Sequence, residues 1–84
     1  MTEQQIQSKL IKELEAQGYY VIKLIKTNKN GIPDLLAIPK QSDIKFYEVK
    51  TSIGRVSKLQ EYRHKELKDY GIYVEVYRGE GGVV

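Results

Sequence analysis

The second half of the chain places a strand, a helix and another strand in direct succession, and this succession strongly constrains the fold. Residues 44–50 are rich in β-branched and aromatic side chains, which favour strands. Apolar residues at helical spacing then predict a helix over 56–70 that ends at Gly71, and a strand over 72–77 follows. A helix between two strands can carry the chain back to the end of the sheet at which the first strand began. We therefore expect the two strands to pair in parallel.

The first half of the chain predicts a helix followed by strands joined through polar turns. The expected elements are a helix over 2–17, strands over 19–25, 34–38 and 44–50, and turns at 27–31 and 40–43. The order is therefore helix, three strands, helix, strand. It predicts an α/β or α+β fold with a mixed sheet flanked by helices. We expect one domain over 1–78 and a glycine-rich tail over 79–84.

Size and composition restrict the kinds of partner. A chain of 84 residues without cysteine builds one small core, and pairing into a homodimer is a common way to stabilise such a core. The start lacks the pattern of a secretory signal, and no apolar run is long enough to cross a membrane, so an intracellular protein is expected. A formal charge of +3 is compatible with a nucleic-acid partner but does not establish one.

Three charged side chains interrupt the predicted hairpin. Asp34 follows Pro33 at the start of one strand, and Glu48 and Lys50 lie two residues apart on the next. Residues two apart project from the same face of a strand, here beside Phe46, where an unpaired charge is costly to bury. Alternatively, Asp34 only stabilises a turn, and Glu48 and Lys50 form an exposed ion pair of little energy.

This combination fits phosphodiester hydrolysis. Asp34 and Glu48 offer hard oxygen ligands for Mg²⁺ or Mn²⁺, and the backbone carbonyl of Val49 is a candidate third ligand. Such an ion lowers the pKa of a bound water and neutralises charge on the phosphate. Lys50 then orients the nucleophile or stabilises the transition state.

The sequence resembles a known nuclease family at three ordered motifs. Gly31-Ile32-Pro33-Asp34 and Tyr47-Glu48-Val49-Lys50 match the PD-(D/E)XK signature, and the segment 54–60 is similar to the G-x-x-S-x-x-Q motif of the virus-type replication-repair nucleases, VRR-NUC. The resemblance extends from Glu3 to Tyr77. It implies a restriction-endonuclease-like core and, for stand-alone phage and bacterial members, junction-resolving homodimers in the cytoplasm of a bacterial or phage-infected cell.

Two further residues match that pattern. The family carries an acidic residue early in the first helix, where Glu3 lies on the stripe expected to face inward, and Gln60 is expected beside Lys50. Both have structural alternatives. An acid in the first turn is favoured by the helix dipole, and the Ser57–Gln60 spacing is typical of a capping box.

The predicted function is thus a Mg²⁺- or Mn²⁺-dependent DNA endonuclease for branched DNA, without a nucleotide cofactor. The alternatives are a flap or linear-DNA nuclease and a catalytically silent DNA-binding module. The candidate DNA contacts, which otherwise are solvated surface, are Lys29, Arg55, Lys58 and Arg63. Asn30 departs from the arginine often found in the family, and His64 is expected on the surface.

Overall fold

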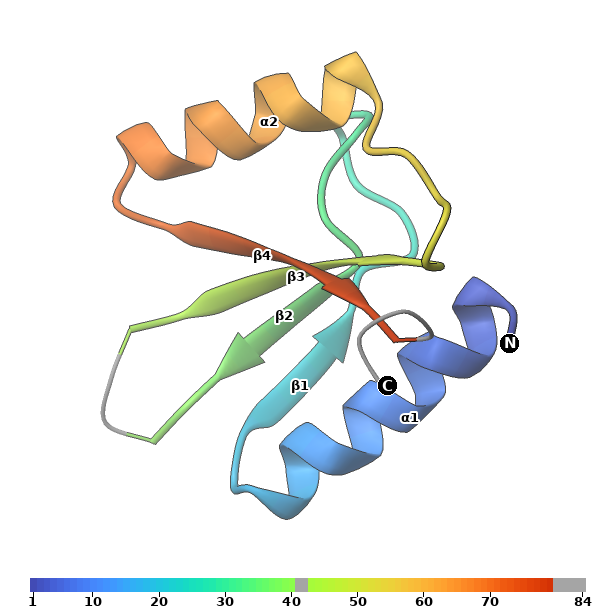
Figure 1. The fold of residues 1–84 in the computed structure, drawn as a ribbon. Coiled ribbons are helices and arrows are strands. Elements are labelled where there is room, and N and C mark those ends of the chain that lie inside the picture. Colours follow the sequence, from blue (N-terminus) through green and yellow to red (C-terminus); the bar gives the residue numbers. More distant parts are fainter. Residues whose placement is uncertain (41–42, 80–84) are drawn as a thin grey trace.

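The computed structural model describes residues 1–40 and 43–79, which form a four-stranded sheet and two helices (Figure 1). The elements are α1 (Glu3–Ala16), β1 (Tyr20–Lys23), β2 (Leu35–Ile38), β3 (Lys45–Lys50), α2 (Lys58–Asp69) and β4 (Tyr73–Arg78). The predicted order is confirmed. The predicted turn at 40–43 and the tail at 79–84 lie partly outside the described residues.

The sheet is mixed, as the sequence predicted. Its strand order is β1-β2-β3-β4, with antiparallel pairing of β1 with β2 and of β2 with β3. The pairing of β3 with β4 is parallel, because α2 carries the chain back between them. No helix in the described part of the chain is long and apolar enough to cross a membrane.

Helix α1 covers one face of the sheet and supplies much of the core. Its start is fixed by a capping box, in which the Thr2 hydroxyl accepts from the Gln5 amide and the Gln5 side chain accepts from the Thr2 amide. In the part of the chain that the structure describes, the core consists of seven buried residues: Ile6, Leu10, Leu14, Leu35, Ala37, Tyr47 and Val49. Each large aliphatic side chain buried there contributes about 1.5–3 kcal/mol.

Helix α2 is attached differently, because none of its residues is fully buried. It begins at Lys58, two residues later than predicted, and Ser57 is its N-cap. Leu59 packs closely on Gly31, where an added Cβ would lie 2.8 Å from the leucine Cγ. Gly31 also has a φ of +82°, which side-chain-bearing residues rarely adopt. The loop after β1 and the start of α2 are therefore held together.

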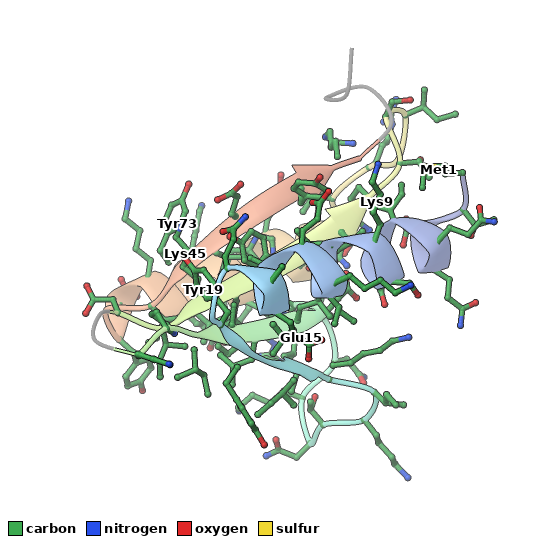
Figure 2. The ribbon with its side chains drawn as sticks, turned by 90° about the horizontal axis from the view of Figure 1, so that it is seen from below. Met1, Lys9, Glu15, Tyr19, Lys45 and Tyr73 are labelled. Atoms are coloured by element: carbon green, nitrogen blue, oxygen red, sulfur yellow. The ribbon has the colours of Figure 1, made fainter. Side chains whose placement is uncertain are left out.

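Figure 2 views the sheet from the side that α1 covers, with Met1 marking one end of this helix. Tyr19, Lys45 and Tyr73 gather near the other end, where Lys45 and Glu75 form an ion pair of 3.6 Å. The start of β2 and the end of β3 lie toward the Met1 end (Figure 1). The predicted acidic residues consequently occupy the end of the sheet near the N-terminus of α1.

Candidate functional site

Asp34 and Glu48 face each other across neighbouring strands. The Asp34 amide donates to the Tyr47 carbonyl at 3.0 Å, and Leu35 pairs with Tyr47 in the antiparallel register. One step further along this register sets Asp34 opposite Glu48, with both side chains on the same face. The sequence predicted this meeting of two carboxyl groups at the end of the hairpin.

The Asp34 carboxylate is oriented by the backbone of β3. Its Oδ2 accepts a hydrogen bond of 2.8 Å from the Val49 amide. This hydrogen bond from a neutral backbone amide holds the Asp34 side chain on the side of Glu48. Val49 thus acts through its amide in this structure, and the ligand role of its carbonyl stays a prediction.

Glu48 is an acid almost without solvent contact, at 1% exposure. Burial, the charge of Asp34 and a hydrogen bond to Asp34 together raise its pKa from 4.5 to about 8, while Lys50 acts in the opposite direction. Glu3 adds a smaller repulsion. These influences place all four ionisable residues within electrostatic range. Glu48 therefore retains a proton at neutral pH, and a divalent cation at this position would remove the repulsion between the two carboxylates.

Two side chains of α2 hold Glu48. Gln60 Nε2 donates to Glu48 Oε2 at 2.8 Å, and His64 Nε2 lies 3.2 Å from Oε1. The two residues are four apart and therefore lie on one face of the helix. Burial lowers the pKa of His64; the negative charge of Glu61 opposes this shift, and the positive charge of Lys50 adds to it. The imidazole is therefore neutral at pH 7.

The expectation that His64 is a surface residue was wrong. Its side chain is 17% exposed and contacts the candidate site. The apolar stripe of α2 does not predict this contact, because His64 lies at the edge of the stripe. Its position one turn after Gln60 was the available signal, since residues four apart share a face.

Gln60 combines the two roles that the sequence left as alternatives. Its Oε1 accepts from the Ser57 backbone amide at 2.9 Å, and the Gln60 backbone amide donates to Ser57 Oγ at 3.1 Å, which completes a capping box. Its Nε2 remains available for Glu48. The oxygen of the Gln60 carboxamide thus belongs to the helix cap, and its nitrogen binds the Glu48 carboxylate. The sequence predicted Lys50 as the neighbour of Gln60, but the side-chain hydrogen bond is to Glu48.

Glu3 lies at the rim of the site. The prediction that it faces inward was wrong, because the side chain is exposed while Ile6 is buried. It lines a cleft of about 520 Å³ together with Gln7, Lys23 and Asp34. A charge in the first turn of a helix stays in solvent when no partner compensates its burial.

A second cleft, of about 310 Å³, also reaches Asp34. Lys26, Lys29 and Gly31 are among its lining residues. Within the described residues, no group of three or more histidine, cysteine or acidic side chains is arranged to hold a metal. Two carboxylates completed by backbone oxygen and water would suit Mg²⁺, which usually keeps several waters.

The predicted DNA contacts fall in different surroundings. Lys29 lines the second cleft, whereas Arg55 in the loop before α2 and Lys58 at the start of the helix are exposed. Arg63 is engaged: its Nε donates to the Asn30 carbonyl at 2.9 Å, and its Nη1 pairs with Glu66 at 2.8 Å. It ties α2 to the loop after β1, and a role in DNA binding stays a prediction.

The sequence interpretation also missed basic residues near Asp34. Lys23 lines the first cleft and Lys26 the second, and both precede the glycine turn in the chain. The spacing of Lys23, Lys26 and Lys29 at every third position was the only signal, and lysines in an exposed loop are too common to be informative alone.

Comparison with known proteins identifies the family of the chain. A sequence model of the VRR-NUC domain matches residues 1–81. A solved structure described as a VRR_NUC domain superposes with a TM-score of 0.84 at 29% sequence identity, covering 99% of this chain and 91% of the other. No curated protein matches the chain. From the extent of the sequence match and the shared fold, the chain belongs to the VRR-NUC family of nuclease domains.

Proposed function

We propose that this protein is a Mg²⁺- or Mn²⁺-dependent endodeoxyribonuclease that cleaves branched DNA, such as four-way junctions, as a homodimer. Membership of the VRR-NUC family carries a nuclease-type function with DNA as substrate. The observation that most supports the metal-dependent chemistry is the opposition of Asp34 and Glu48 at the ends of neighbouring strands, with Lys50 within electrostatic range.

Each residue of the site has a role that follows from its contacts. Asp34 and Glu48 hold the cation, with the Val49 carbonyl as a further oxygen. When bound, the ion supplies a nucleophile at neutral pH and neutralises phosphate charge. Lys50 offers a positive charge to the oxygens of the phosphate as negative charge develops on them. Gln60 fixes the orientation of the Glu48 carboxylate from α2.

The clefts beside Asp34 are the proposed path of the DNA backbone. Lys23 lines one, and Lys26 and Lys29 line the other. Lysines at these positions attract phosphates and release condensed counterions, so binding should weaken as salt rises. They position a strand without reading its sequence, as expected of an enzyme selecting DNA by shape.

Support for a homodimer comes from the face of the sheet opposite α1. Tyr20, Ile22 and Ile44 are exposed at 70, 38 and 37%, and the register places Leu36 and Phe46 on the same face as Ile22. A second copy would remove these side chains from water. Two sites related by a twofold axis would also cut two strands of a junction symmetrically.

The test is cleavage of a four-way junction, a flap and a linear duplex of matched sequence with Mg²⁺ or Mn²⁺. We expect the junction to be cut fastest. Asp34→Asn should abolish cleavage and leave DNA binding in place, whereas the matched control Asp69→Asn, at the exposed end of α2, should behave as wild type. Undiminished cleavage by Asp34→Asn would locate the chemistry elsewhere.

The same experiment separates the alternatives. Faster cutting of the flap or duplex would remove the branched substrate and favour the linear-DNA nuclease. DNA binding without cation binding or cleavage would favour the silent module. Sedimentation of wild type and Ile22→Lys tests the dimer, because a charge on the apolar face should separate the two copies.

A further inference from the structure

Gln7 carries a buried acceptor without a donor. Among the side chains of residues 1–40 and 43–79, its Oε1 is the buried polar atom that has no hydrogen-bond partner. Native proteins rarely leave such an atom unsatisfied, because its lost contact with water is not compensated. An unsatisfied group of this kind therefore calls for a donor that the protein itself does not provide.

The surroundings of Gln7 indicate which donor is missing. Gln7 lies one helical turn after Glu3, and both residues line the cleft that reaches Asp34. Lys23 lines the same cleft, but it forms no hydrogen bond to Gln7 in this structure. Gln7 is thus a lining residue of the cleft that reaches the proposed cation ligand Asp34, and its carboxamide oxygen is buried there without a donor.

We propose that Gln7 is a positioning residue whose Oε1 accepts a hydrogen bond from the hydration shell of the divalent cation held at Asp34. This inference rests on the proposed metal-dependent function and adds a residue to it. Mg²⁺ gives up its waters reluctantly, so most of its shell must find acceptors in the protein. Gln7 and Glu3 provide an amide and a carboxylate oxygen from successive turns of one helix.

Replacing the Gln7 amide distinguishes a role in holding the hydrated ion from a structural role. The substitution should raise the stability of the metal-free protein in the first case and lower it in the second. Gln7→Met replaces the amide by an apolar side chain of similar length and removes the unsatisfied acceptor. If the acceptor serves the cation, the metal-free variant should melt several degrees higher, as expected from a small gain in an 84-residue protein. Its affinity for Mn²⁺ should fall about tenfold or more, as for other residues that contact bound metal indirectly.

Two matched variants complete the experiment. Gln17→Met makes the same chemical change at the exposed C-cap of α1 and should alter neither property. Gln7→Glu keeps an oxygen at the position and should bind Mn²⁺ at least as tightly as wild type. Melting is followed without metal, and Mn²⁺ alone, without DNA, is titrated by calorimetry.

The outcomes are decisive in either direction. An unchanged Mn²⁺ affinity in Gln7→Met, or a variant that melts lower or fails to fold, would show that the amide serves the structure and would overturn the inference. The proposed function has a separate test, because wild type must bind Mn²⁺ and cleave DNA. Failure of wild type would contradict the nuclease, while failure confined to the Gln7 variants would contradict only the positioning role.

Discussion

Divalent cation binding should release the proton that Glu48 holds in the metal-free protein. Burial, followed by the charge of Asp34 and the hydrogen bond to Asp34, raises the pKa of this carboxyl to about 8. A carboxyl group must be ionised to coordinate a metal, so binding displaces the proton. His64 is not its source, because burial lowers the pKa of the imidazole.

The magnitude follows from the pKa. With a value of about 8, roughly 0.9 proton is released per cation at pH 7 and roughly 0.1 at pH 9. Apparent affinity should therefore be about tenfold weaker at pH 7 than at pH 9, and about tenfold weaker again at pH 6.

The same pKa determines the pH dependence of the metal-free fold. The pKa of Glu48 rises from 4.5 to about 8 on folding, so the folded state binds the additional proton between these values. The stabilisation is complete below about pH 4.5 and is lost as pH rises through about 8, with a slope of about 1.4 kcal/mol per unit in between. Glu48→Gln should remove this slope.

Calorimetric titration of Mg²⁺ or Mn²⁺ in two buffers of different ionisation enthalpy measures the released proton directly. Wild type should show a buffer-dependent heat at pH 7 that nearly disappears at pH 9. Denaturant unfolding of wild type and Glu48→Gln across this pH range measures the stability slope. Equal cation affinity at both pH values, with no dependence on buffer, would refute protonation of Glu48 in the metal-free protein.

Further predictions concern the contacts that hold the site. Ser57→Ala should cost about 1 kcal/mol of unfolding free energy and leave cation affinity unchanged, because it removes only the helix cap. Gln60→Leu should cost about 2 kcal/mol and also weaken cation binding, since it removes the side-chain half of the capping box and the contact to Glu48; equal cation affinity in the two variants would contradict this role. Gly18→Ala should cost about 1–2 kcal/mol through its positive φ alone. Gly31→Ala should cost more, because its Cβ also meets α2, and equal losses in denaturant unfolding would argue against that packing.

The element order and the pairing of strands were predictable because they depend on local patterns. Apolar periods of two and of about 3.6 residues distinguish strands from helices, and a helix between strands requires a crossover. The Thr2 and Ser57 capping boxes were equally local, since each lies within one turn. The opposition of Asp34 and Glu48 followed from these patterns, because a short hairpin leaves little freedom in its register.

Contacts between distant elements could not be obtained in this way. Whether His64 reaches Glu48, and whether Arg63 faces DNA or the Asn30 carbonyl, depends on how α2 lies over β3 and the glycine turn. Several rotations of a helix bury similar areas, so its apolar stripe fixes the packed side only approximately. The raised pKa of Glu48 and the unsatisfied Gln7 acceptor likewise exist only once packing removes water from them. Sequence periodicity established the framework and its acids, whereas desolvation and helix placement established their environment.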